Sequence, residues 1–264
     1  MKILRARHLG MCFGVRDAIQ LANQESSRGP LTILGDLVHN ETVMSDLRRR
    51  GVGVERDPDA VRTETVMITA HGASERLLTA VRRRGHRLLE ATCPLVHHAH
   101  RALKTLVEQG YHPVVIGQKG HVEVRGLTGD YPESEVVLNE EEIARMTPRP
   151  RFGVVAQTTQ PIARVRQLVG VIRSRFPESE VVFRDTVCQP TKLRQDAAVE
   201  MAAESDIVIV IGGAASNNTR ELVATCRTRC NRVYHVQGPA DLDPSWFHEN
   251  DTVGITAGTS TPDS

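Results

Sequence analysis

Aromatic side chains and excess charge are both scarce in this sequence. Only 3% of the 264 residues are aromatic, and Trp246 is the single tryptophan. Proteins that bind single-stranded nucleic acid stack bases on aromatic rings, so we expect no nucleic-acid partner. The 33 basic and 32 acidic residues leave a formal net charge of +1, which creates no general attraction for anions. Any anion must therefore bind in a local site.

Long apolar runs are also missing. No run approaches the roughly 20 residues that cross a bilayer, and residues 1–7 lead into patterned sequence without the apolar core of a signal peptide. We therefore expect a cytoplasmic protein that makes no use of a membrane. The five cysteines are an odd number and cannot all pair. In the reducing cytosol they are more readily thiols or metal ligands than a disulfide framework.

Short runs rich in Val, Ile and Leu alternate with segments of helical period. Six runs predict strands, at residues 31–34, 65–70, 113–116, 152–156, 207–211 and 252–256. Helices are predicted between them, for example at residues 15–23, 94–109, 161–175, 191–203 and 218–227. This alternation is typical of βα units around largely parallel sheets, so the predicted fold class is α/β.

A polar group follows each of the six predicted strands. In chain order these groups are His39-Asn40, His71-Gly72, His121, Thr158-Thr159, Ser216-Asn217-Asn218 and Thr259-Ser260. The carboxyl ends of strands, near the start of the next helix, are where α/β proteins bind ligands. We therefore expect these groups to line a binding site.

Three cysteines repeat with the same period. The interval from cysteine to polar group is 27, 28 or 28 residues, for the pairs Cys12–His39, Cys93–His121 and Cys188–Ser216. The chain thus reads as three copies of one plan, which predicts lobes at residues 1–93, 94–190 and 191–264. A roughly threefold arrangement would gather three thiolates at its axis and surround them with hydrogen-bond donors.

The local sequence separates these three cysteines from inert buried thiols. Cys12 precedes a predicted helix, while Cys93 and Cys188 are followed closely by Pro94 and Pro190, and proline is favoured in a first helical turn. The amides of a helix N-terminus favour thiolate. Three thiolates would leave one iron of a four-iron cluster open as a Lewis acid.

The other two cysteines have a different setting. Cys226 and Cys230 stand at the end of a predicted helix, and their spacing of four has no matching partners nearby. We interpret both as structural. The three repeating cysteines are separated by 81 and 95 residues, which matches no zinc-ribbon or zinc-finger spacing.

The polar groups after the strands suit a compact anion with two or three charges, because they are largely uncharged donors. This set consists of His39, His71, His121, Ser216, Asn218 and Ser260. Zinc bound by the three histidines is the competing interpretation, but it gives the serines and asparagine no role. We interpret His97, His98 and His100, on the predicted helix 94–109, mostly as a solvated polar face.

Glu123 is the single acid next to a strand-end histidine. It lies two residues after His121, at the start of a helical segment. This makes it the best candidate proton donor, and an exposed helix-start glutamate is the alternative.

Eight segments, in order along essentially the whole chain, resemble the 4-hydroxy-3-methylbut-2-enyl diphosphate reductase family. They are GMCFGV at 10–15, VHN at 38–40, AHG at 70–72, ATCPLV at 91–96, GHVEV at 120–124, QTT at 157–159, SNN at 216–218 and TAGTSTPD at 256–263. Each motif alone is modest, whereas eight in register are highly specific. The resemblance implies three small α/β lobes with pseudo-threefold symmetry around a central iron–sulfur cluster.

The resemblance also implies roles for individual residues. Cys12, Cys93 and Cys188 would hold one 4Fe-4S cluster with one open iron. The diphosphate would be bound by His39, His71, His121, Ser216, Asn217, Asn218 and Ser260. Glu123 would deliver protons, and Thr158 would hold the substrate hydroxyl and relay them.

The implied reaction is the last step of the methylerythritol phosphate pathway. It is the reductive dehydroxylation of an allylic diphosphate to isopentenyl and dimethylallyl diphosphates. An external donor such as flavodoxin or ferredoxin would supply the electrons, because Gly212-Gly213 lacks the spaced third glycine of a nucleotide fingerprint. A non-catalytic sensor of the same fold that binds the cluster or the diphosphate is the alternative, and a zinc hydrolase is a third possibility.

Two features depart from the family pattern. Family members normally continue beyond the Ser-x-Pro-Asp signature into structure that packs on the first lobe, whereas this sequence stops at Ser264. Either the tail is short or missing and the lobe with Ser260 is less stable, or the natural chain is longer. Ala73 stands where the family usually has valine, a conservative change that leaves His71 in place.

Overall fold

All six runs predicted to be strands form strands in the computed structural model, which describes residues 1–262. They are β2 (Leu31–Leu34), β4 (Thr65–Ile68), β6 (His112–Ile116), β8 (Arg151–Ala156), β10 (Ile207–Ile211) and β12 (Thr252–Ala257). Six more strands complete the sheets: β1 (Lys2–Arg5), β3 (Gly53–Glu55), β5 (Arg87–Glu90), β7 (Glu135–Val137), β9 (Glu180–Phe183) and β11 (Val233–Val236). Asp263, the last residue of the eighth motif, lies outside the described residues.

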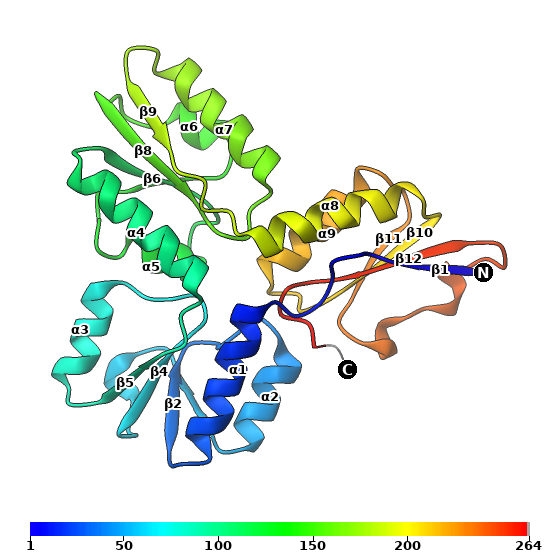
Figure 1. Cartoon of the computed structure of the whole chain (residues 1–264), viewed down its shortest axis with the longest axis horizontal. Helices are drawn as coiled ribbons and strands as arrows, with labels where there is room; N and C mark the ends of the chain where they lie inside the picture. The colour runs from blue at the N-terminus through cyan, green and yellow to red at the C-terminus, as the bar shows by residue number, and fades with distance from the viewer. Residues whose placement is uncertain (263–264) are drawn as a thin grey trace. The chain divides into compact units, whose positions relative to one another are not determined.

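The twelve strands form three parallel four-stranded sheets (Figure 1). Their orders are β3-β2-β4-β5, β7-β6-β8-β9 and β11-β10-β12-β1. In each sheet the two predicted strands are the central pair, and the two strands that the sequence did not reveal are the edges. The six central strands are largely buried, which explains their continuous apolar sequences.

The N-terminal strand completes the third sheet. In the first two sheets the strand order, counted along the chain within each lobe, is second, first, third, fourth. The third sheet follows the same plan, but its fourth place is taken by β1, which pairs with β12 from Lys2↔Thr252 to Arg5↔Ile255. The lobe boundaries predicted from the sequence did not include this exchange, because they placed residues 1–93 together.

Helices connect the strands. The predicted ones are α1 (Phe13–Ser26), α4 (Pro94–Glu108), α7 (Ile162–Arg175), α8 (Gln189–Ala203) and α9 (Asn217–Arg227). The others are α2 (Glu41–Arg49), α3 (Glu75–Arg83), α5 (Val122–Thr128) and α6 (Glu140–Ala144), with short 3-10 turns η1 (Pro58–Ala60), η2 (Pro239–Asp241) and η3 (Pro244–Trp246). Within residues 1–262, no helix has the length and apolarity needed to span a membrane.

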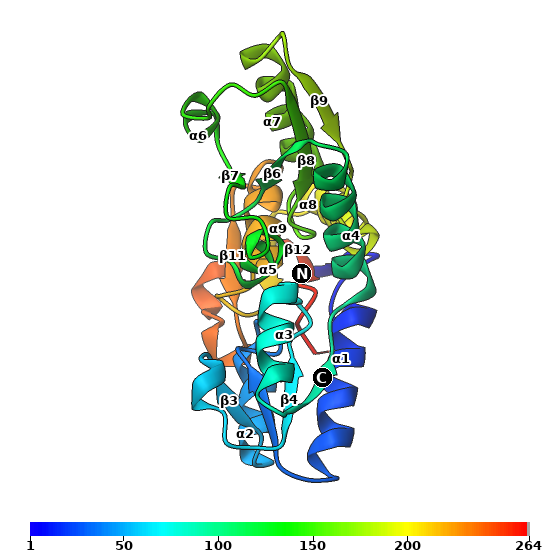
Figure 2. The ribbon, with the colours of Figure 1, turned by 90° about the vertical axis from the view of Figure 1, so that its left-hand side faces the viewer.

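The chain divides into two compact units. The first unit comprises Met1–Arg16, Val38–Met44 and Cys188–Ser264, and the second comprises Asp17–Leu37 and Ser45–Val187. The second unit contains two of the sheets. In the sheet of β6 to β9, Val115 packs with α4 and α5 on one face, and its neighbour Val114 packs with α6 and α7 on the other. Helices α3 and α1 likewise lie on opposite sides of β4, which Figure 1 shows between them, and Figure 2 gives the same helices from the side.

The first unit contains the third sheet, whose two faces are covered differently. Val208 and Val210 of β10 pack against α8 and α9. The opposite face packs against Trp246 and Phe247 near η3, and no helix of the described chain covers it as α3 and α7 cover the other two sheets. Ile3 of β1, which lies on this face, is 63% exposed.

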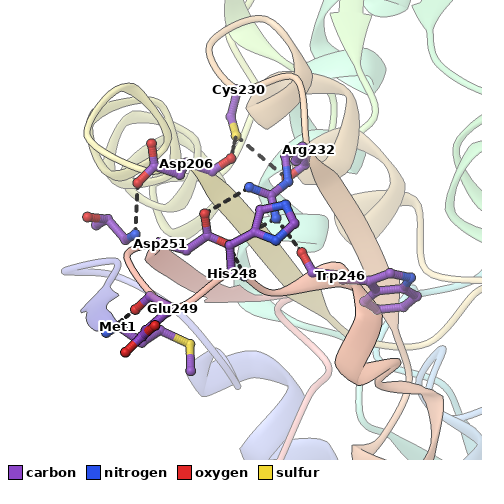
Figure 3. A network of polar contacts seen from close by, with 9 residues as sticks. Met1, Asp206, Cys230, Arg232, Trp246, His248, Glu249 and Asp251 are labelled. Carbon is purple, nitrogen blue, oxygen red and sulfur yellow. Dashed lines mark hydrogen bonds and ion pairs between the residues drawn. The ribbon is translucent and has the colours of Figure 1, made fainter.

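An ion-pair network fixes the loops beside this sheet (Figure 3). The guanidinium of Arg232 bonds both carboxylate oxygens of Asp251 at 2.9 Å and also donates to the carbonyl of Trp246. Asp251 Oδ2 in turn accepts from the backbone N of His248 at 2.7 Å. This network anchors the loop that leads into β12.

Candidate functional site

The three repeating cysteines each occupy the residue before a helix. Their carbonyl oxygens accept the first helical hydrogen bonds at 3.0, 3.0 and 3.1 Å, from Arg16 to Cys12, from His97 to Cys93 and from Lys192 to Cys188. Each cysteine also follows the fourth strand of a sheet, namely β1, β5 or β9. The positive end of the helix dipole therefore lies next to each of these half-buried cysteines.

Backbone bonds hold the turns around these cysteines. In the first unit, Cys12 N donates to Thr259 O at 3.0 Å, and Cys188 Sγ lies 3.1 Å from the hydroxyl of the fully buried Thr191. In the second unit, Cys93 N donates to Ala70 O at 3.0 Å. Each sulfur is therefore presented from a fixed turn, as a metal ligand requires.

Cys226 and Cys230 are built differently. Both are buried in the core under α9. Burial raises the pKa of the Cys226 thiol to about 12, and nearby Cys230 adds to the shift. The sulfur of Cys230 contacts the carbonyl oxygens of Asp206 and Arg232 at 3.5 Å (Figure 3). Both residues therefore pack in the protein interior, in agreement with the structural interpretation.

The six polar groups follow the six central strands, as the sequence predicted. His39-Asn40 follows β2, His71 follows β4, His121 follows β6, Thr158-Thr159 follows β8, Ser216-Asn217-Asn218 follows β10 and Thr259-Ser260 follows β12. Three of these groups lie at helix starts. His121 caps α5, Ser216 caps α9, and Asn40 Oδ1 accepts from Val43 N at the start of α2.

In the first unit the predicted anion-binding residues come together. The carboxamide of Asn218 is 1% exposed, and its Oδ1 accepts from Thr259 N at 2.9 Å. This bond fixes the orientation of the amide, so that Nδ2 is left as a buried donor with no partner among residues 1–262. A buried donor without a partner is costly, and an anionic ligand would satisfy it.

His39 and Ser260 also meet in this unit. Ser260 Oγ donates to the carbonyl oxygen of His39 at 3.2 Å. Gly213 permits a close approach to the same carbonyl, because a Cβ at this position would lie 2.3 Å from His39 O. In the sequence, Gly213 is only part of an incomplete nucleotide fingerprint, because the carbonyl that it contacts belongs to a residue far away along the chain.

In the second unit Glu123 is fully enclosed. Its side chain is 1% exposed, so the alternative of an exposed helix-start glutamate is wrong. Oε1 accepts from Thr158 N at 2.6 Å and Oε2 accepts from Thr158 Oγ1 at 2.9 Å. Burial raises the pKa of Glu123 to about 7, although the bonds from Thr158 act in the opposite direction. A carboxyl group of this kind can both hold and release a proton near neutral pH.

Two predicted histidines lie close to one another in this unit. The rings of His71 and His121 pack edge to face, with centroids 5.6 Å apart. His121 Nδ1 accepts from Glu123 N at 3.1 Å. A neutral ring in this arrangement carries its proton on Nε2, which is then a donor for an anion.

Gln157 is a supporting residue that was not among the predicted site residues. It is fully buried, its Oε1 accepts from Gln118 N at 3.0 Å, and its Nε2 donates to Thr159 at 3.1 Å. It therefore joins the loops that follow β6 and β8, which carry His121 and Thr158. Its place in the QTT motif was the feature of the sequence that could have identified it.

The interpretation of the α4 histidines as a solvated face holds for only part of the group. His98 is exposed, but Nε2 of His100 is buried and would lie 3.3 Å from a Cβ at Gly72. Burial lowers the pKa of His100 to about 4. His100 is therefore a neutral packing residue beneath the turn that carries His71.

Fold and site together define a class of protein. It is a three-lobed parallel α/β protein with cysteine thiols at three helix starts, a buried acid, and a buried amide donor, Asn218 Nδ2, without a partner among residues 1–262. The chain belongs to the LytB protein family, whose model matches residues 3–264. This agrees with the resemblance seen in the sequence, and the predicted three-lobed α/β fold is confirmed.

Curated relatives match over nearly the full chain. The 4-hydroxy-3-methylbut-2-enyl diphosphate reductase of Trichlorobacter lovleyi is 37% identical, covering 99% of this chain and 94% of the relative. The enzyme of the same name from Aquifex aeolicus is 36% identical, covering 99% and 92%.

Solved structures agree. The E-1-hydroxy-2-methyl-but-2-enyl-4-diphosphate reductase of Plasmodium falciparum superposes with a TM-score of 0.92 at 25% identity, covering 99% of this chain and 84% of that one. A second structure, of (E)-4-hydroxy-3-methyl-but-2-enyl diphosphate reductase, gives a TM-score of 0.70 at 36% identity, covering 99% and 95%.

Proposed function

We propose that this protein is an oxidoreductase that converts 4-hydroxy-3-methylbut-2-enyl diphosphate to isopentenyl and dimethylallyl diphosphates. The reaction consumes two electrons and two protons and releases the hydroxyl group as water. The observation that carries this proposal is the family match along residues 3–264, with relatives of this name aligned over 99% of the chain.

The donor set of the chain fits an iron–sulfur cluster. Cys12, Cys93 and Cys188 would hold one 4Fe-4S cluster, because each offers a half-buried thiol at the start of a helix. When bound, such a cluster supplies electrons and one iron without a protein ligand. Zinc held by histidines would leave these three thiols without a function. An external donor such as flavodoxin or ferredoxin would deliver the electrons, and we place the protein in the cytoplasm.

The polar residues after the central strands would bind the diphosphate. Asn218 offers its buried Nδ2, and His121 offers Nε2–H while its Nδ1 stays engaged with the backbone. The rest of the proposed set is His39, His71, Ser216, Asn217 and Ser260. Neutral donors at helix starts suit a multiply charged group without requiring arginine.

Glu123 and Thr158 would move the protons. Since the pKa of Glu123 is about 7, the carboxyl group can hold a proton in its buried position, give it up there and remain as a carboxylate. The hydroxyl of Thr158 bonds Glu123 Oε2 and retains acceptor capacity for the hydroxyl group of the substrate. By rotating its proton, this hydroxyl can relay between carboxyl and substrate. A non-catalytic sensor would have no use for this pair.

Anaerobic purification tests the cofactor part of the proposal. The expected result is a brown protein with about four irons per chain, whose visible spectrum changes when the allylic diphosphate is added. Colourless protein that carries zinc, or a cluster whose spectrum ignores the diphosphate, would contradict the proposal.

A further inference from the structure

A buried arginine joins two of the cysteine turns in the first unit. Arg194 of α8 is 9% exposed. Its Nε and Nη2 both donate to the carbonyl oxygen of Gly10, at 3.0 and 2.8 Å, and its Nη1 donates to the carbonyl oxygen of Pro190 at 3.0 Å. Gly10 lies two residues before Cys12, and Pro190 lies two residues after Cys188. One planar guanidinium thus connects the turns of both thiols.

The turn at Gly10 depends on its bonds to Arg194. Gly10 is buried and has a φ of +74°, a left-handed conformation that favours glycine. Its N–H donates to Ala257 O at 3.1 Å, and its carbonyl accepts the two bonds from Arg194. Removing the arginine would leave the carbonyl of the buried Gly10 without these two bonds, which destabilises the turn.

The internal repeat shows that this arginine is a departure from the common plan. Helices α1, α4 and α8 each begin one residue after a cysteine, so the sixth residue after each cysteine occupies the same place on its helix. Those residues are Ala18, Ala99 and Arg194, and the two alanines are fully buried. A small side chain is therefore sufficient for packing at this place, and the large cation serves a purpose that only the third helix needs.

We propose that Arg194 is a positioning residue that locks the Cys12 and Cys188 turns together and makes the bound cluster easier to reduce. The proposal rests on the function proposed above. Reduction adds negative charge, and a fixed cation held between the two cysteine turns stabilises that charge in a medium of low dielectric constant. The planar guanidinium makes two bonds to the carbonyl of Gly10 and a third bond to the carbonyl of Pro190. The single ammonium group of lysine cannot make all three bonds at once.

Three variants separate charge from geometry in the anaerobically purified holoprotein. Arg194→Met removes both, Arg194→Lys keeps the charge but loses the fork, and Arg229→Met removes an exposed arginine as the control. The measurements are iron per chain, the rate of iron release to a chelator, and the midpoint potential from a redox titration followed by absorbance, all without substrate.

Arg194→Met is expected to lower the reduced-to-oxidised ratio about tenfold at a fixed potential, equal to ~59 mV for a one-electron couple. Both Arg194 variants should release iron about tenfold faster than the wild type, and Arg194→Lys should keep the wild-type potential. If Arg194→Lys released iron at the wild-type rate, the positioning role would be overturned. This variant tests the bonds from Arg194 to Gly10 and Pro190 even if the methionine variant does not fold. A wild-type potential in Arg194→Met would overturn the electrostatic role. If the wild-type protein, purified anaerobically, contained no cluster at all, the proposed function itself would be refuted.

Discussion

Both carboxylate oxygens of Glu123 are occupied by one residue, Thr158, which donates from its backbone N at 2.6 Å and from its hydroxyl at 2.9 Å. The two bonds hold the acid in one orientation inside a site that water does not reach, since Glu123 is 1% exposed. The same burial brings its pKa to about 7. The bonds from Thr158 therefore fix the position of the acid, while burial raises its pKa.

Replacing Glu123 by glutamine is expected to lower the turnover number at least 100-fold, a typical share for a general acid. The glutamine keeps the shape and can still bond Thr158, but it has no proton to give. The assay is anaerobic turnover at saturating substrate, with iron content measured on the same sample. Glu141→Gln, at an exposed position on α6, is the matched control. Undiminished turnover in Glu123→Gln would assign the proton to another group.

The raised pKa of Glu123 also predicts how stability depends on pH. The folded protein retains this proton up to about pH 7, whereas an unfolded glutamate loses it near pH 4.5. The stability that the protonated group contributes is thus complete below pH 4.5 and is lost as the pH rises through 7. Between pH 5 and pH 8 the loss is about 2 kcal/mol.

Chemical denaturation of the wild type and of Glu123→Gln, at several pH values, measures this loss directly. The difference in free energy of unfolding between the two proteins should shift by that amount in favour of the glutamine variant at pH 8. A difference that stays constant with pH would mean that Glu123 titrates as an ordinary surface acid.

Asn218→Asp exchanges the buried Nδ2 donor for a carboxylate oxygen while keeping the size of the side chain. Oδ1 can still accept from Thr259 N, but the second oxygen would face the diphosphate with like charge. We expect KM to rise at least tenfold, with a smaller effect on kcat. Asn139→Asp is the control, since Asn139 caps α6 through its oxygen and aspartate caps equally well. Equal KM values for both variants would show that Asn218 does not bind the diphosphate.

Cysteine replacements distinguish ligands from packing residues. Cys93→Ser removes a thiol at the start of α4 and should abolish the intact cluster, seen as loss of the brown colour and of iron per chain. Cys226→Ser alters a thiol in the core under α9 and should leave the iron content unchanged. Equal iron in the two variants would show that Cys93 is not a ligand.

The sequence predicted the centre of each sheet and missed its edges, for a physical reason. β4 and β10 are covered on both faces, so they consist of continuous apolar residues that stand out in the sequence. The edge strands β5 and β9 carry charged and half-exposed residues, and short stretches of that kind look like loops. The pairing of β1 with β12 joins the two ends of the chain and has no local signal.

The site divides in the same way. The spacing of Cys12, Cys93 and Cys188 predicted three copies of one plan, and the residues next to each cysteine predicted the start of a helix. The burial of Glu123 was not predictable, since it depends on the loop after β8 closing over α5. The clamp between Arg194 and Gly10 spans 184 residues and joins a side chain to a carbonyl that any residue could offer.

The central claim is that this chain reduces an allylic diphosphate. Its most direct test is anaerobic incubation of the purified protein with 4-hydroxy-3-methylbut-2-enyl diphosphate and a chemical reductant, followed by separation of the products. The account predicts isopentenyl and dimethylallyl diphosphates, formed over many turnovers and only when reductant is present. Recovery of unchanged substrate from protein that carries a full cluster would contradict it.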